Sequence, residues 1–377
     1  MNARQRVIQT LDHQLPDRVP LAIWGGPYGI VDELYFKLLP LLGLSEPVAP
    51  FRQGHTVNHI DDRVLKKLGA DIRYVWPGAS PTSPRYPTDD PDIFLDGFGQ
   101  KWIQTFPYFT ATDGLLKQAH SISEIDELVN WPDTSKPEWT AGVAERSCIL
   151  AKDGEYYIAA RMVVSHGPFQ LACDLRGAAE FMLDMVMNPD FAAALLDKVT
   201  TTICGLTDAY MQSGGQYYDL IELPGDDYAS NVNLIISPKM FRDFIKPCIK
   251  RMVETIRAHK SDIKIMLHSD GAIQKLIPDF IELGIDVLHP LEPVSGIDVA
   301  AVKHEFGQQI AFIGGIDISK AMPGNLQDVC TDVDRCIRDL APRGGYIMAP
   351  CNHLQADVSP ENVIEMFSYA CENGRYK

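Results

Sequence analysis

Short apolar segments alternate with longer amphipathic segments along this chain of 377 residues. Each short segment is an almost continuous apolar run, which is typical of strands buried on both faces of a parallel sheet. About eight runs are expected to form strands: Val19 to Trp24, Asp71 to Trp76, Tyr156 to Val164, Tyr217 to Leu223, Ile263 to His268, Ile285 to His289, Gln309 to Gly314 and Gly345 to Pro350. The pattern therefore predicts an α/β protein with a parallel sheet.

The segments between the strands carry helix start signals. Ser237-Pro238 and Ser359-Pro360 place Ser at the N-cap and Pro at the first helical position. Alternating strands and helices form either a doubly wound sheet or a closed barrel. About eight repeats favour the barrel, and Trp24 to Gly29 does not fit the G-x-G-x-x-G loop of nucleotide-binding sheets. We therefore predict one (β/α)8 TIM-type barrel domain over residues 1–377.

The stretch from Pro77 to Pro137 departs from this alternation. It is rich in Pro, Asp, Gly and aromatic residues, a composition typical of loops. We expect a long insertion over the C-terminal mouth of the barrel, with a small hairpin from Ile93 to Phe106.

The net charge and the cysteines limit the partners and the cellular compartment that we expect for this protein. The formal net charge of -16 argues against nucleic acid and anionic membranes as partners. No apolar h-region follows Met1 and no run approaches about 18 apolar residues, so we expect neither export nor a membrane span. The 8 cysteines are scattered without a C-x-x-C pair, which predicts reduced thiols in a cytoplasmic protein.

Ionisable and aromatic residues gather where the predicted strands end. In such a barrel these ends form the active site, and burying so many polar groups without a use would be costly. The residues, in chain order, are Trp24, Trp76, His166, Glu222, Asp226, Asp227, His268, Asp270, His289, Glu292, Asp317, Cys351 and His353.

Two of these strand ends predict a metal centre. His268 and Asp270 follow one strand, and Cys351 and His353 follow another. An imidazole, a carboxylate and a thiolate can hold catalytic zinc with one position open. The third ligand is either Cys351 or His353. In the alternative interpretation, His268 is a hydrogen-bonded structural residue, Asp270 caps a helix and Cys351 is an inert buried thiol.

Three further residues are candidates for catalysis. Glu222 can serve as general base, metal ligand or substrate clamp. Asp227 and His289 are also candidates, although Asp227 can equally cap a turn and His289 can equally form a structural corner before Pro290.

Several motifs, in their order along the chain, resemble the uroporphyrinogen decarboxylase superfamily. They are Asp62 to Asp71, Asp96-Gly-Phe-Gly99, Gly167-Pro-Phe169, Ile236-Ser-Pro238 with Phe241, His268-Ser-Asp-Gly271, Pro278 to Pro290, Phe312 to Asp317, and Gly344 through Asn362. The resemblance implies a (β/α)8 barrel and either of two chemistries, decarboxylation or methyl transfer.

Departures from the family's sequence patterns favour methyl transfer over decarboxylation. The decarboxylases carry an arginine-rich R-Q-A-G-R loop after the first strand, where this chain has Trp24 to Ile30 without arginine. The chain looks more similar to the corrinoid-dependent methyltransferases, whose zinc is held by H-x-C and a distant Cys. Asp270 replaces the first of those cysteines, which gives a harder ligand set suited to an oxygen leaving group.

This resemblance implies an O-demethylase that uses Zn²⁺. It would pass a methyl group from a small methoxylated, aromatic substrate to the cobalt of a separate corrinoid protein. The expected substrate-binding residues are Trp24, Tyr28, Trp76, His166 and Phe169. A cofactor-free decarboxylase and a non-catalytic ligand-binding barrel are the alternatives, and a homodimer is compatible with the sequence.

Overall fold

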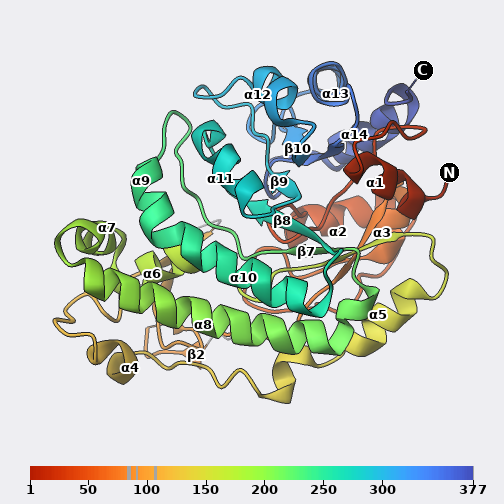
Figure 1. Ribbon diagram of the computed structural model, residues 1–377. Coiled ribbons are helices and arrows are strands. Elements are labelled where there is room, and N and C mark those ends of the chain that lie inside the picture. Colours follow the sequence, from red (N-terminus) through yellow and green to blue (C-terminus); the bar gives the residue numbers. More distant parts are fainter. Residues whose placement is uncertain (83–85, 91, 106–107, 377) are drawn as a thin grey trace.

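A parallel sheet of seven strands forms the centre of the protein (Figure 1). The strands are β1 (Ile72–Val75), β6 (Tyr157–Ala160), β7 (Leu220–Glu222), β8 (Lys264–His268), β9 (Val287–His289), β10 (Ala311–Ile316) and β11 (Tyr346–Pro350), and they are hydrogen-bonded in this order. The computed structural model describes residues 1–82, 86–90, 92–105 and 108–376. Six of the seven strands lie within apolar runs identified in the sequence, whereas β10 begins within the run 309–314 and continues to Ile316.

An extended segment closes the gap between the two edge strands. The backbone N–H of Ala22 donates to the Met348 carbonyl at 2.9 Å, and the N–H of Asp71 donates to the Leu21 carbonyl at 2.8 Å. Residues 19–24 therefore lie between β11 and β1 as an eighth element. The predicted TIM-type barrel is confirmed, but residues 19–24 form a single bridge rather than a regular strand. Pro20 lacks the N–H that a ladder would require.

Helices surround the sheet. Those before β7 are α1 (Ala3–Leu11), α2 (Asp32–Leu41), α3 (Asp62–Lys67), α4 (Glu124–Leu128), η1 (Pro137–Thr140), α5 (Val143–Ala151), α6 (Pro168–Arg176), α7 (Ala178–Met187), α8 (Pro189–Gly214) and η2 (Gly215–Tyr217). Those after it are α9 (Pro238–Met240), η3 (Phe241–Ile245), α10 (Lys246–His259), η4 (Gln274–Leu276), α11 (Ile277–Glu282), α12 (Val299–Phe306), α13 (Leu326–Leu340) and α14 (Pro360–Asn373). Figure 1 shows α8 and α10 side by side along one flank of the barrel.

Both predicted helix starts are confirmed. The Ser237 side chain accepts a hydrogen bond from the N–H of Met240, and the Ser359 side chain accepts one from the N–H of Asn362. Each satisfies an N–H that would have no partner in the first turn.

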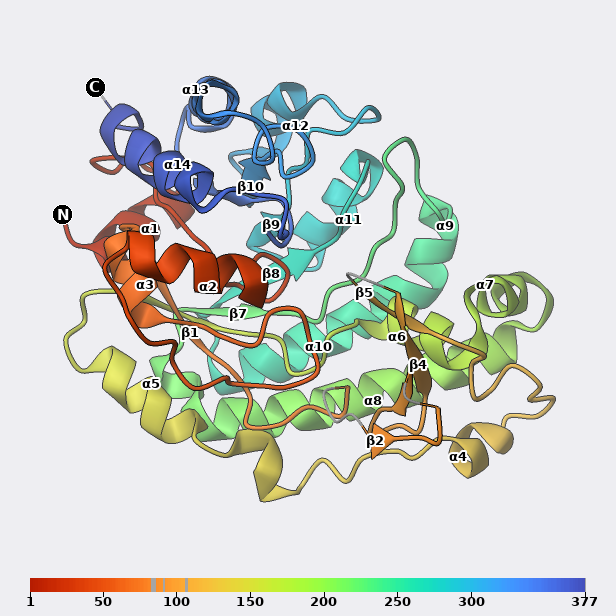
Figure 2. The ribbon, with the colours of Figure 1, turned by 180° about the vertical axis from the view of Figure 1, so that it is seen from behind.

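The insertion forms a second, antiparallel sheet, seen beside α6 and α8 in Figure 2. Its strands are β2 (Tyr86–Pro87), β3 (Ile93–Leu95), β4 (Lys101–Thr105) and β5 (Tyr108–Ala111). The predicted hairpin corresponds to β3 and β4, although its last residue, Phe106, lies outside the described residues. The Trp102 ring lies 6.1 Å from that of His166, and the Thr82 and Ser165 hydroxyls are 3.3 Å apart. These contacts place the insertion at the loop after β6, as expected for the C-terminal mouth.

Candidate metal centre and cavity

A cavity of about 660 Å³ opens where the barrel strands end. This size suits a small organic molecule. Its walls come from the loops that follow the strands and from the start of the insertion. They include Gly26, Phe51, Arg52, Ser80, Arg161, His166, Asp227, His268, Asp270, Asn352 and His353.

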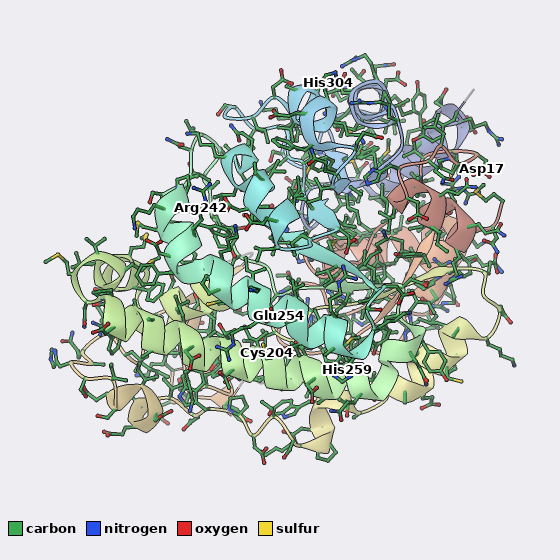
Figure 3. All side chains as sticks on the ribbon, viewed as in Figure 1. Asp17, Cys204, Arg242, Glu254, His259 and His304 are labelled. Atoms are coloured by element: carbon green, nitrogen blue, oxygen red, sulfur yellow. The ribbon has the colours of Figure 1, made fainter. Side chains whose placement is uncertain are left out.

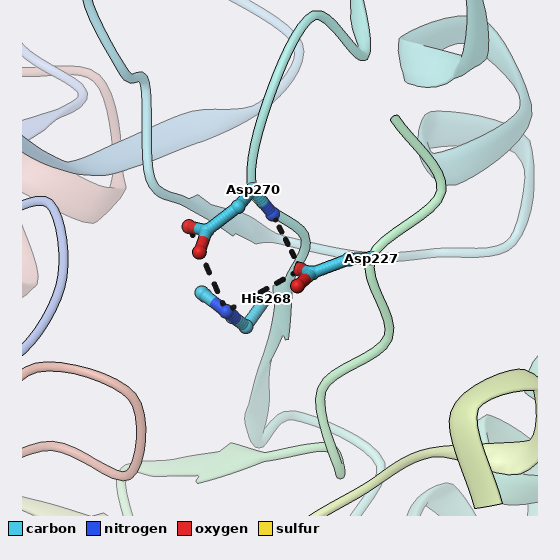
Figure 4. A group of neighbouring side chains, drawn as sticks. All are labelled: Asp227, His268 and Asp270. Carbon is cyan, nitrogen blue, oxygen red and sulfur yellow. Dashed lines mark hydrogen bonds and ion pairs between the residues drawn. The ribbon is translucent and has the colours of Figure 1, made fainter. Parts of the chain in front are cut away.

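Three of these residues form a compact group of possible metal ligands (Figure 4). His268 ends β8, Asp270 follows it, and Asp227 comes from the loop after β7. One ligand atom from each lies within 4.8 Å of the others. The His268 Nε2 atom is 3.7 Å from Asp227 Oδ1 and 3.7 Å from Asp270 Oδ1. The N–H of Asp270 donates to Asp227 Oδ1 at 2.8 Å, which fixes the two acidic residues relative to each other.

The hydrogen bonds behind His268 determine its tautomer. His289 Nε2 lies 3.2 Å from the Pro350 carbonyl, which can only accept, so Nε2 carries the proton. Burial lowers the pKa of His289 well below 6.5, so its ring is neutral and Nδ1 accepts. The partner of His289 Nδ1 is His268 Nδ1 at 2.8 Å, so His268 Nδ1 must donate the hydrogen bond. Burial also lowers the pKa of His268, so its neutral ring directs the Nε2 lone pair toward Asp227 and Asp270.

Asp270 also lacks a partner for one of its oxygen atoms. Its Oδ2 accepts from Asn352 Nδ2 at 2.8 Å, whereas its buried Oδ1 has no hydrogen bond among the described residues. Burial, together with the charges of Asp227 and Glu292, raises the pKa of Asp270 well above 3.8. A lone pair and two carboxylate oxygens thus face one another, and a cation or proton between them would relieve their repulsion.

The geometry of the three residues fits a divalent cation. Tetrahedral ligands bound to zinc at about 2.1 Å lie about 3.4 Å from one another. The observed separations of 3.7 Å from His268 Nε2 are close to that value. Three ligands would leave a fourth position facing the cavity, which all three residues line.

The two alternative third ligands of the sequence analysis lie outside this group. The Cys351 thiol is 1% exposed and lies 4.0 Å from the Leu291 carbonyl. Burial raises the pKa of this thiol well above 9.0, which favours the thiol over a metal-binding thiolate. The His353 ring lines the cavity and its Nδ1 has no hydrogen-bond partner among the described residues. Burial, with Arg52 and Arg161, lowers the pKa of His353 to about 3.

The predicted catalytic residues take different positions. Asp227 is a member of the group, and His289 lies directly behind it. Glu222 is 1% exposed, and its Oε2 accepts from the Gly26 N–H at 2.7 Å. Burial raises the pKa of Glu222 to about 7. Its other carboxylate oxygen has no hydrogen bond in the described part of the chain.

Of the five predicted substrate-binding residues, His166 lines the cavity and the other four pack behind its wall. Tyr28 stacks on His289 with 4.5 Å between ring centroids, and Trp24 meets Tyr35 edge-on at 5.9 Å. Trp76 packs on Phe51 and Phe169 packs on Phe181. Aromatic residues next to strands fill the core here because their rings bury the most area.

Several cavity residues were missed by the sequence analysis. Phe51 and Arg52 come from an irregular loop that carries no motif. Asn352 directly follows Cys351, but no role is predicted for its amide from the sequence. Arg161 offered a detectable signal, since it is the one charge within the apolar run 156–164. The run predicts one strand through Val164, but β6 ends at Ala160 and leaves Arg161 at the cavity.

A family model matches most of this structure. The model described as Uroporphyrinogen decarboxylase (URO-D) covers residues 121–372. The chain belongs to the uroporphyrinogen decarboxylase family. This confirms the resemblance seen in the sequence motifs, and the matched region contains the Asp227, His268 and Asp270 group.

Individual relatives are distant. A chloroplastic uroporphyrinogen decarboxylase from Zea mays is 25% identical over 264 residues, which are 68% of this chain and 61% of the relative. Uroporphyrinogen decarboxylase from Chlorobium limicola is 23% identical over 195 residues, covering 51% of this chain and 52% of the relative. The matches thus span between half and two thirds of the relatives' length.

A solved structure shares the whole fold. A methyltransferase from Methanosarcina mazei superposes with a TM-score of 0.63 at 17% identity and covers 99% of both chains. This similarity supports the barrel assignment. Within the described residues, no helix has the length and apolar character needed to cross a membrane.

Proposed function

We propose that this protein is a zinc-dependent methyltransferase that demethylates a small methoxylated compound and passes the methyl group to the cobalt of a separate corrinoid protein. The observation that supports it is the group of Asp227, His268 and Asp270, in which a neutral imidazole lone pair faces two carboxylates at the cavity wall. The likeness to a Methanosarcina methyltransferase over the full length is compatible with this function.

The reaction requires the methyl carbon to leave an ether oxygen. Cobalt(I) would supply the electron pair of the new Co–C bond, while the electrons of the broken C–O bond stay on oxygen, which then takes up a proton. Zinc held by Asp227, His268 and Asp270 would stabilise the negative charge on that oxygen. The chain itself supplies orientation, because His289 holds His268 and Asn352 holds Asp270.

His166 can supply the proton. It lines the cavity, and its Nδ1 lies 2.6 Å from Asp174 Oδ2. Although burial opposes it, the charge of Asp174 raises the pKa of His166 above 6.5. Asp174 thus favours the protonated imidazole at the cavity wall, and this imidazole could donate to the leaving oxygen.

The metal is tested by zinc titration of chelator-treated protein. We expect one zinc per chain for the wild type and none for His268→Ala. The matched control is His304→Ala, which removes an exposed histidine from α12 (Figure 3) and should leave zinc binding unchanged. Equal zinc binding by the wild type and His268→Ala would refute the proposed metal centre.

The reaction is tested with free cob(I)alamin as acceptor and methoxylated aromatics as donors, followed at the cobalt absorbance. We expect methylcobalamin with the zinc-loaded wild type and none with His268→Ala. The second candidate function is decarboxylation, which the family match and the names of the relatives favour. Release of carbon dioxide from a uroporphyrinogen, without methylcobalamin from any donor, would establish that function instead.

A further inference from the structure

One wall of the cavity carries a buried positive charge. Arg161 follows β6, lines the cavity and is only 4% exposed. Its Nη2 atom donates to the carbonyls of Gly25 and Gly26 at 3.2 and 3.3 Å. Its Nε has no hydrogen-bond partner among the described residues. A guanidinium has five N–H groups, so its bonding capacity is far from satisfied.

The charge of Arg161 also lacks an ion-pair partner. No carboxylate of the described residues lies within 4.0 Å of its nitrogen atoms. The acidic group with the largest effect on the pKa of Arg161 is Glu222, whose Oε2 accepts from the Gly26 N–H at 2.7 Å. A buried charge that is neither paired nor fully hydrogen-bonded costs several kcal/mol. An anion entering the cavity would offset that cost.

A second arginine adds positive charge to the same part of the cavity. The guanidinium centres of Arg161 and Arg52 lie 4.9 and 5.0 Å from the centroid of the Phe51 ring. All three residues line the cavity. Arg52 is oriented by its own bonds to the Val57 carbonyl and the His55 ring. The Phe51 ring thus lies next to two cations in the cavity wall.

The cavity is therefore polarised. Arg161 and Arg52 bring positive charge to the wall beside Phe51, and Asp227 and Asp270 bring negative charge to the wall beside His268. A ligand that matches both parts has an anionic group for the arginines and a neutral oxygen for the metal centre. Arginine binds carboxylates through two parallel N–H donors, which suits a planar carboxylate.

We propose that Arg161, with Arg52, forms a carboxylate-binding subsite, so that the substrate is a methoxylated organic acid whose carboxylate lies at Arg161. This inference deepens the proposed function and rests on it for the methoxy group. The carboxylate would fix the ligand at one end and leave its ether oxygen free to meet the metal centre.

Binding is measured by calorimetry with two matched pairs of probes. The pairs are 4-methoxybenzoate with 4-methoxybenzamide, and methoxyacetate with methoxyacetamide. A charge-assisted bond to Arg161 should make at least one acid bind about 10- to 100-fold more tightly than its amide. The preference should disappear in Arg161→Gln and be largely retained in Arg161→Lys, which keeps the charge.

Arg338→Gln serves as the control, because it removes an arginine on α13 that is 69% exposed. It should keep the wild-type preference. Circular dichroism establishes that each variant is folded. Equal affinity for acid and amide in the wild type would overturn the subsite. So would an unchanged preference in Arg161→Gln, or no binding of either acid.

These outcomes separate the subsite from the proposed function. Binding of an acid that depends on Arg161, without methylcobalamin from any donor, would keep the subsite and reject methyl transfer. Methyl transfer from the amides as fast as from the acids, in wild type and Arg161→Gln alike, would keep the function and reject the subsite.

Discussion

His289 is the residue that makes His268 a suitable metal ligand. It accepts the Nδ1 proton of His268 at 2.8 Å and is itself fixed by the Pro350 carbonyl at 3.2 Å. Groups that orient a ligand in this way tune affinity without touching the metal. The same arrangement predicts that His268 presents a lone pair at Nε2 whenever both rings are neutral.

Replacing His289 by Phe should therefore weaken zinc binding. Phe keeps an aromatic ring against Tyr28 but cannot accept the His268 proton, so the ring of His268 loses its orientation. We expect zinc affinity to fall about 10- to 100-fold, as seen for other groups that support a ligand. Competition with a fluorescent chelator measures this. Tyr74→Phe, which loses only a hydroxyl 3.3 Å from that of Tyr28, is the control. Zinc affinity equal to the wild type in His289→Phe would contradict the proposal that His289 orients His268.

Glu222 is a buried acid with a measurable effect on stability. Burial raises its pKa from 4.5 to about 7, although Arg161 and the Gly26 N–H lower it. In the unfolded chain it ionises near its ordinary pKa. Below the pKa of the unfolded chain, the protonated Glu222 makes its full contribution to the free energy of unfolding. Between the two pKa values the folded state holds more protons, so the free energy of unfolding falls as pH rises to about 7.

We expect Glu222→Gln to remove this part of the pH dependence. The shift corresponds to about 3 kcal/mol across the window, and Gln keeps an oxygen for the Gly26 N–H. Asp226, whose pKa is also raised to about 7, leaves a remaining slope of the same sign. Urea unfolding between pH 4.5 and 8 measures the change. Glu254→Gln, whose side chain is 64% exposed on α10, is the control. A slope identical to the wild type would rule out the buried acid as its cause.

At the scale of elements, the β3–β4 turn of the insertion is organised by a single carboxylate. Asp96 accepts hydrogen bonds from the N–H groups of Phe98 and Gln100 at 2.9 and 3.0 Å. It also accepts from Trp102 Nε1 at 2.9 Å, and Trp102 packs against His166. This turn therefore connects the second sheet to the cavity wall.

Asp96→Ala should loosen the insertion without unfolding the barrel. Three donors lose their acceptor, each at a cost of about 1–3 kcal/mol where it stays buried. We expect faster amide hydrogen exchange in β3 and β4 and unchanged exchange in β8. Asp89→Ala, an exposed position in the same insertion, should alter neither. Equal loss of protection in β8 would show that the insertion is not a separable element.

At the scale of the whole molecule, Asp71 connects α1 and the segment 18–21 to the start of β1, where the barrel closes. Its buried side chain accepts from Arg6 Nη1 at 2.6 Å, from Arg18 Nη1 at 2.9 Å and from the Leu21 N–H at 2.8 Å. Arg6 belongs to α1, and Leu21 to the segment between β1 and β11. Arg18 forms a backbone bridge with Arg375, so the two chain ends meet on one side, as Figure 2 shows.

Asp71→Asn should destabilise the entire fold. It removes the charge opposite Arg18 and one of the two carboxylates opposite Arg6, whose other partner is Asp17, so we expect a loss of about 3 kcal/mol. Urea unfolding followed by circular dichroism measures the loss. Asp12→Asn removes a half-exposed carboxylate 3.6 Å from Lys264 and should cost far less. If both substitutions cost the same, the role assigned to Asp71 in closing the barrel is wrong.

The sequence by itself determined the barrel, the positions of its strands along the chain and two members of the proposed metal centre. Apolar runs of five to nine residues that are buried on both faces are typical of a parallel sheet covered by helices, and His268 and Asp270 adjoin one such run. The local signals at Ser237 and Ser359 were also sufficient to predict where two helices begin, because a helix cap is formed within one turn.

Only the tertiary structure decided which residues meet across the barrel. The strand ends predict that His268 meets Cys351 or His353, whereas the fold brings Asp227 to 3.7 Å from His268. Nothing local distinguishes these choices, because β7 and β11 both end at the cavity and side-chain direction depends on strand register and loop course. The same holds for Arg161, whose place at the cavity follows from β6 ending at Ala160. Contacts between distant segments are set by packing of the whole chain, which no single run of residues encodes.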